Sequence, residues 1–111
     1  MSKTVGKKRP CGRGISVYTF LNIDIAFDAA KDRRNIAHHG VSLALAAKLE
    51  WDLMLAREDA REAYGEQRWI GVAPIGRLLY CVVFTEEDDV YRIISLRKAT
   101  AREVRDYARE I

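Results

Sequence analysis

The apolar run from Leu78 to Phe84 limits the folds open to this chain more than any other feature. It is too short to cross a membrane as a helix, which needs about 20 apolar residues. Because both alternating faces of the run are apolar, it suits a central strand that is covered on both sides. Turn signals precede and follow it. The sequence therefore predicts three antiparallel strands, at Glu66–Val72, Arg77–Thr85 and Val90–Arg97, joined by turns at 73–76 and 86–89.

Helix-start and helix-stop signals place two helices before these strands. Asp28 is a suitable N-cap for a helix that runs to about His38 and ends at Gly40. Ser42 is a suitable N-cap for a second helix that runs to about Glu50.

The remaining segments complete the predicted order. Ile15–Ile25 is β-rich and is expected to hold the first strand, Trp51–Ala56 a short strand and Arg57–Gly65 a loop. Thr100-Ala101-Arg102-Glu103 is a capping box, which predicts a last helix over Ala101–Ile111. The fold class is therefore α+β: a central antiparallel meander with two N-terminal helices and a C-terminal helix.

Length and charge predict one domain with a basic arm. A chain of 111 residues supports a single core. Residues 1–14 are rich in Lys, Arg, Gly and Pro, so we expect a mobile tail there and one domain over residues 15–111. The formal net charge is +3, but five cations precede the first acidic residue, so the body is net −2. Any cationic surface on the domain must be local.

Two cysteines, Cys11 and Cys81, give neither a disulfide framework nor zinc-ligand spacing. This usage is typical of a reducing cytoplasm. We expect no cofactor, no signal peptide and no membrane span.

The strand that ends in Arg97 and Lys98 carries cations that cannot be buried unpaired. A guanidinium offers a planar fork of donors that fits phosphate. The alternative is that these residues are edge side chains paired with Asp or Glu. Strand alternation puts Arg92 on one face and Arg97 on the other, so the two converge only if a bulge or the strand end redirects Arg97.

A polar stripe lies on one face of the first predicted helix: Lys31, Asn35, His38 and His39. A histidine near a helix C-terminus has its protonated form favoured by the helix dipole, which suits a general acid. The alternative is that His38 or His39 only satisfies the last free carbonyls. Glu66 and Arg68 also share one side of their predicted strand. They are either a catalytic base beside a phosphate-binding arginine or a simple cross-strand salt bridge.

Three separated blocks together resemble the BrnT family. They are Asp28-x-x-Lys31-x-x-x-Asn35-x-x-x-His39-Gly40-Val41-Ser42, then Gly65-Glu66-x-Arg68, then Arg92-Ile93-Ile94-Ser95-x-Arg97-Lys98-Ala99-Thr100 with Glu103 and Tyr107. The resemblance covers about Ile23 to Tyr107. It departs where the family usually has Trp, Lys and Ala, at Phe27, His38 and Leu96. The second predicted helix also lacks, over Leu43–Ala47, the aromatic and acidic residues that are common in the family.

The resemblance implies a RelE-like fold and a metal-independent endoribonuclease toxin that cleaves RNA by 2′-hydroxyl attack and inhibits translation and growth. Its expected catalytic residues are Arg68, Arg97, Glu66 and His39, and its expected RNA-binding residues are Lys31, Arg92, Lys98 and His38. If the usual Lys binds RNA, His38 replaces it only when protonated.

The resemblance also implies partners. The expected inhibitor is a cognate ribbon-helix-helix antitoxin, with two toxins bridged by an antitoxin dimer and operator DNA contacted mainly through the antitoxin. The alternative is a non-catalytic module that binds nucleic acid or protein. Cleavage of RNA without metal, with arginine variants as controls, separates the two classes.

Overall fold

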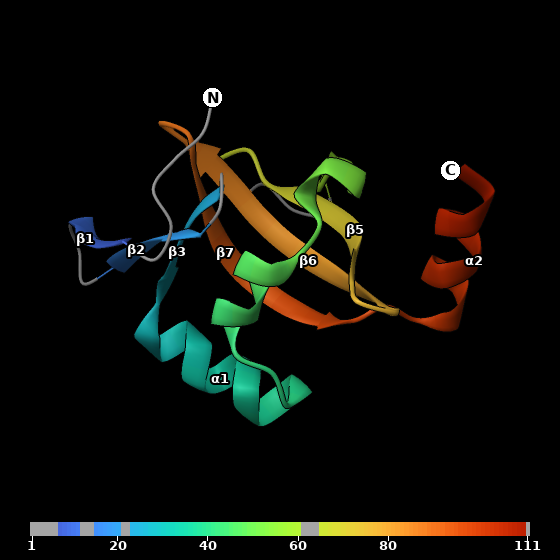
Figure 1. The fold of residues 1–111 in the computed structure, drawn as a ribbon, viewed down its shortest axis with the longest axis horizontal. Helices are drawn as coiled ribbons and strands as arrows, with labels where there is room; N and C mark the ends of the chain where they lie inside the picture. Colours follow the sequence, from blue (N-terminus) through green and yellow to red (C-terminus); the bar gives the residue numbers. More distant parts are fainter. Residues whose placement is uncertain (1–6, 12–14, 21–22, 61–64, 111) are drawn as a thin grey trace.

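A computed structural model describes residues 7–11, 15–20, 23–60 and 65–110. Within them, seven strands form one sheet in the order β1-β2-β3-β7-β6-β5-β4 (Figure 1). The strands are β1 Lys7–Cys11, β2 Ile15–Phe20, β3 Ile23–Asp28, β4 Leu55–Glu58, β5 Trp69–Ile75, β6 Leu78–Glu87 and β7 Val90–Lys98. The helices are α1 Ala29–His39 and α2 Ala101–Glu110, with short 3-10 helices η1 Leu43–Lys48 and η2 Trp51–Leu53.

The α+β class and the meander are confirmed. Strands β4 to β7 pair antiparallel in sequence order, and β6 lies between β5 and β7 as its apolar composition predicts. The sheet as a whole is mixed, however, because β3 runs parallel to β7 over Asp24–Ala26 and Val90–Arg92. A parallel pair requires a long crossover between its strands, and here most of the domain supplies it.

The N-terminal region differs from expectation. The single strand predicted within Ile15–Ile25 is two antiparallel strands, β2 and β3. Lys7–Cys11, expected in a mobile tail, forms β1 and pairs with β2. Residues 1–6 and 12–14 lie outside the described residues, and the division into a tail and a domain stays a prediction.

The first helix is confirmed at both ends. Asp28 Oδ1 accepts a hydrogen bond from the Ala30 N–H at 2.7 Å. Gly40 takes a left-handed conformation with φ of 75°, and its N–H donates to the Ile36 carbonyl at 2.8 Å. That conformation favours glycine, which is why the helix ends there.

The second predicted helix is wrong in type and length. Ser42 caps it as expected, but η1 is a 3-10 helix that ends at Lys48. The chain then turns toward the sheet, where the Glu50 N–H donates to the Pro74 carbonyl at 3.0 Å. Trp51 therefore begins η2 rather than a strand, and β4 starts only at Leu55.

The strand predicted over Glu66–Val72 begins later, at Trp69, and continues to Ile75. Gly65 has a φ of 76°, which turns the chain just before Glu66. The hairpin turn falls at positions 76–77, where Gly76 has a positive φ, rather than over 73–76. Glu66 and Arg68 are thus in the connection that leads into β5, not in the strand itself.

The two faces of the sheet are covered differently. The main core packs η1 and η2 against one face, with Leu43, Val82, Ile93 and Leu96 almost completely buried. Figure 1 shows these short helices crossing in front of the sheet, while α1 lies below and α2 stands to one side. The opposite face carries a smaller cluster of Ile70, Cys81, Val83, Val72 and Ile94. We call this second side the open face.

A bulge in β7 sets which residues reach the open face. Val83 of β6 pairs with Ser95, but the next β6 residue pairs with Ile93, so Ile94 has no partner. Accordingly Ile93 and Leu96, three residues apart, both enter the main core. Arg92 and Arg97 then fall on the same side of the strand, because one extra residue reverses the alternation. The bulge therefore brings Arg92 and Arg97 to the same face of the sheet, which is the condition for them to converge.

Asn35 attaches α1 to the edge of β7 beyond its pairing with β3. Its amide Nδ2 donates to the carbonyls of Leu96 at 2.7 Å and Val41 at 3.0 Å, while Oδ1 accepts from the Leu96 N–H at 3.1 Å. The side chain thus replaces a neighbouring strand at Leu96. Because Asn35 is buried, losing these bonds would leave backbone groups unsatisfied, at about 1–3 kcal/mol each.

Candidate functional site

A cluster of three cations around one carboxylate lies at the edge of the open face. Arg92 Nη2 lies 2.8 Å from both carboxylate oxygens of Glu66. Arg68 Nε lies 3.4 Å from Glu66 Oε2. Glu66 therefore joins the connection before β5 to strand β7. We call Lys31, Glu66, Arg68 and Arg92 the basic cluster.

Lys31 belongs to the basic cluster through electrostatics. Partial burial lowers the pKa of its ammonium below the usual 10.5, and the positive charges of Arg68 and Arg92 lower it further. Lys31 and Arg92 also border the same small hollow, together with Ile93 and Ile94. The first turn of α1 thus brings an amine to the arginines on β7 and before β5.

A hollow of about 330 Å³ continues from the basic cluster along the groove between α1 and β7. Two histidines at the end of α1 border it, and their ring centroids are 6.2 Å apart. At this end of α1 the Gly40 N–H donates to the Ile36 carbonyl, and the Asn35 amide donates to the Val41 carbonyl. These bonds thus come from Gly40 and Asn35 and not from a capping histidine. The hollow is lined by Lys31, Arg34, Asn35, His38, His39, Ile94 and Ser95.

Arg97 lies at the far end of the same face and has a different partner. Its Nη1 and Nη2 donate to the two oxygens of Glu103 at 2.8 and 3.0 Å, which ties β7 to α2. These bonds and the Thr100 N–H lower the pKa of Glu103 to about 2, although burial opposes the shift. Glu103 also forms the predicted capping box with Thr100. Arg97 therefore has a structural bond to the last helix.

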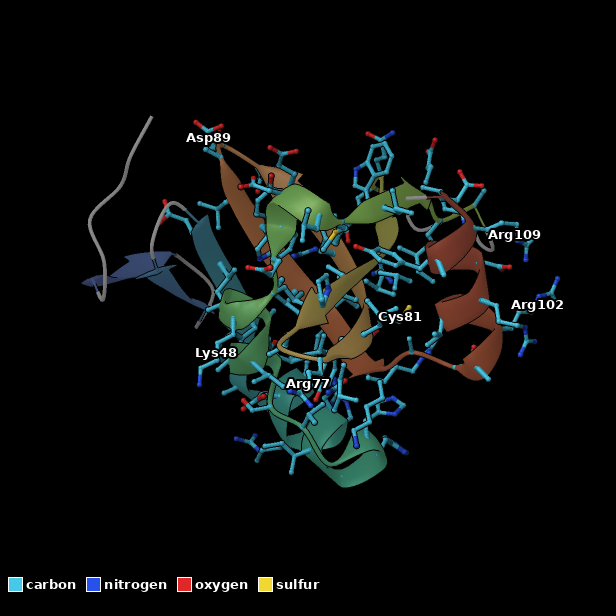
Figure 2. All side chains as sticks on the ribbon, turned by 45° about the vertical axis from the view of Figure 1, so that its right-hand side comes forward. Lys48, Arg77, Cys81, Asp89, Arg102 and Arg109 are labelled. Carbon is cyan, nitrogen blue, oxygen red and sulfur yellow. The ribbon has the colours of Figure 1, made fainter. Side chains whose placement is uncertain are left out.

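Cys81 lies beneath this ion pair. Figure 2 shows it on β6, on the side of the sheet that α2 approaches. Burial raises the pKa of its thiol to about 11, so the thiolate is scarce at neutral pH. The thiol therefore acts as a small apolar group of the open face.

The structure brings most of the predicted site residues to one face and separates one. Lys31, Glu66, Arg68 and Arg92 are together, while His38 and His39 border the adjoining hollow. Lys98 is exposed and pairs in register with Tyr80, a residue of the main core, so strand alternation puts it opposite Arg97. The predicted ion-pair alternatives also hold, since both Arg92 and Arg97 bind carboxylates.

Sequence reasoning missed Arg34 and Ser95, which also line the hollow. Helical spacing could have found Arg34, since it lies three residues after Lys31 and four before His38. Ser95 stands in the third block of the resemblance but was given no role, and the bulge at Ile94 is what brings it to the same face as Arg92.

Two searches confined to the described part of the chain were negative. No three or more His, Cys, Asp or Glu side chains there are grouped so as to hold a metal ion. No helix there is long and apolar enough to cross a membrane.

Comparison with known proteins gives one family. The family model for the ribonuclease toxin BrnT of type II toxin–antitoxin systems matches residues 27–103. The matched segment begins near the end of β3, includes the basic cluster and ends at Glu103. No individual curated protein matches the chain.

The Arg97–Glu103 pair predicts a pH-dependent stability. Because the folded pKa of Glu103 is about 2 against an ordinary 4.5, its stabilisation is complete above pH 4.5 and is lost as pH falls toward 2. Glu103→Gln should therefore melt lower than the wild type at pH 7, with the difference shrinking through pH 4 to 3. Glu110→Gln, exposed on the same helix, is the control. A difference that grows on acidification contradicts the assignment.

Proposed function

The chain belongs to the BrnT family of ribonuclease toxins of type II toxin–antitoxin systems, and we propose that it is an endoribonuclease that works without a metal ion. In this proposal the 2′-hydroxyl of RNA attacks the adjacent phosphorus in line. The 5′-oxygen leaves, and the products are a 2′,3′-cyclic phosphate and a 5′-hydroxyl. Cleavage of RNA in the cytoplasm would inhibit translation and growth.

The observation that carries the proposal is the basic cluster. Negative charge on the phosphate oxygens in the transition state needs fixed positive charge nearby, which a metal ion supplies in many nucleases. Here Arg68 and Arg92 both contact Glu66. Their positive charges act on Lys31, so three cations lie in one small region. The Arg92 contacts with Glu66 use only one of its three nitrogens. A guanidinium has five N–H donors, so Arg92 has donors for a phosphate besides those that contact Glu66.

The ion pairs of the basic cluster are also open to exchange. The side chains of Arg92 and Glu66 are 35 % and 38 % exposed. Ion pairs at this exposure contribute only about 0–1 kcal/mol, so a phosphate can replace the carboxylate at little cost. We assign Glu66 to positioning the arginines, since both of its oxygens are occupied by Arg92.

In this proposal the roles of the other predicted residues follow from where each side chain lies. Arg97 would bind a neighbouring phosphate of the same strand, because the bulge puts it on the face of Arg92. His38 would bind RNA at the hollow, and His39 would take the 2′-hydroxyl proton there. Lys98 lies on the opposite side of β7 and is left out of the proposed RNA surface.

The first test is cleavage by arginine variants. Arg92→Ala and Arg68→Ala should each lower kcat/KM on RNA by about 100-fold or more, because each removes charge that stabilises the transition state. The wild type should keep its activity with a chelator present and should leave a 2′,3′-cyclic phosphate, measured by mass spectrometry. Arg33→Ala, exposed on α1, is the control. RNA bound but never cut would favour a non-catalytic binding module.

Membership of this family implies a cognate antitoxin, and we propose that it is a ribbon-helix-helix protein. Two toxins would be bridged by an antitoxin dimer, and the operator DNA would be contacted mainly through the antitoxin. An inhibitor must cover the basic cluster and Arg97, so it should bring acidic residues to them.

The second test is assembly. Co-expression with the adjacent gene should give one complex whose mass, by light scattering, equals two copies of each chain. Arg92→Glu should weaken that complex, because the substitution reverses a charge at the covered face. An adjacent gene product that elutes separately and leaves toxicity unchanged would contradict the antitoxin proposal.

A further inference from the structure

Lys31 holds a position that no other titratable side chain of the described residues shares. It borders the 330 Å³ hollow that contains the two histidines. It also borders a second, smaller hollow together with Asp28, Arg92, Ile93 and Ile94. Lys31 therefore stands between the guanidiniums and the space along β7. A phosphate bound by Arg92 would have Lys31 beside it, toward that space.

Two other polar side chains near this point, Arg92 and Asn35, are already engaged. Arg92 binds both oxygens of Glu66. Asn35 uses its amide nitrogen and oxygen to hold α1 on β7. A guanidinium keeps its proton at any working pH, so the arginines can bind the phosphate but are poor proton donors. An ammonium is a proton donor that also carries charge.

We propose that Lys31 is the general acid of RNA cleavage, donating an Nζ proton to the 5′-oxygen as that oxygen leaves phosphorus. The inference rests on the proposed ribonuclease function and gives it a named donor. In the step, the 2′-oxygen–phosphorus bond forms while the phosphorus–5′-oxygen bond breaks. The 2′-hydroxyl proton goes to His39, as in the proposed function, and the Lys31 proton ends on the 5′-hydroxyl. Water then reprotonates the amine, so no net proton is consumed.

The electrostatic surroundings suit this role. Burial and the like charges of Arg68 and Arg92 lower the pKa of Lys31, which makes its proton easier to give. Asp28 raises that pKa and so keeps the amine protonated before the reaction. The charged and titratable groups facing Lys31 are Asp28 at the end of β3, Arg34, His38 and His39 on α1, Arg68 before β5, and Arg92 on β7.

The leaving group provides the test. Two matched oligonucleotides carry one cleavable ribose each, one with the natural 5′-oxygen and one with sulfur in its place. A thiolate leaves without protonation, so an acid is needed only for the oxygen substrate. Lys31→Met should lose about 100-fold or more in the cleavage step of the oxygen substrate, the usual scale of acid catalysis. On the sulfur substrate the same variant should stay within about threefold of the wild type.

Controls separate the acid from its charge. Lys31→Arg keeps the positive charge, so it should restore RNA binding but not cleavage of the oxygen substrate. Arg33→Met, on the same helix and exposed, should match the wild type on both substrates. Cleavage of the oxygen substrate by the wild type should also fall at alkaline pH with an apparent pKa below 10.5, a limb that Lys31→Met lacks.

The outcomes distinguish a failure of the acid role of Lys31 from a failure of the ribonuclease proposal itself. Equal losses on both substrates, or full rescue by Lys31→Arg, would show that Lys31 only positions the phosphate and would overturn the acid role alone. A wild type that cuts neither oligonucleotide nor natural RNA would overturn the ribonuclease proposal and this inference with it.

Discussion

One residue in β7, Ile94, has no partner in β6, and the open face of the sheet depends on that bulge. Without it, Arg92 and Arg97 would alternate to opposite sides of the strand, and one of them would face the main core. With it, Ile93 and Leu96 fill the main core while both arginines remain accessible. Bulges often redirect side chains next to functional sites, and this one lies in the strand that carries both Arg92 and Arg97.

The ion pairs on this face differ in exposure and in how many bonds hold them. Arg97 and Glu103 form a two-bond pair that also fixes the start of α2, so its loss would disturb the helix. The pairs of Glu66 with Arg68 and Arg92 join a connection to a strand and are more exposed at Glu66. The basic cluster can therefore exchange a carboxylate for a phosphate while Arg97 and Asn35 keep the frame in place. In Figure 2, Arg102 and Arg109 on α2 point away from the sheet, so they lie apart from this exchange.

Local signals predicted the elements whose ends depend on nearby residues. Asp28 and Gly40 bound α1, and the capping box of Thr100 and Glu103 begins α2, because those interactions span only a few residues. The apolar run of β6 likewise identified an internal strand. What failed depends on distant contacts. The bond from Glu50 to Pro74 cuts the second helix short, and the parallel pairing of β3 with β7 joins the two ends of the domain.

The same distinction applies to the site. Residue type and the family resemblance selected Glu66, Arg68 and Arg92, and the structure puts them in contact. The resemblance also put Lys98 beside Arg97 in the predicted site, whereas strand alternation places the two on opposite faces of β7. Ser95 was given no role in the predicted site, because its position on the face of Arg92 depends on the bulge.

The central claim is that the basic cluster binds the phosphate to be cleaved. An RNA oligonucleotide with a 2′-deoxy sugar at the cleavage site cannot react, and its binding can be followed through the arginine Nε–Hε signals in NMR spectra. The signals of Arg68 and Arg92 should shift together and saturate at one Kd, while those of Arg102 and Arg109 stay in place. Shifts confined to the arginines of α2, with Arg68 and Arg92 unchanged at saturation, would contradict it.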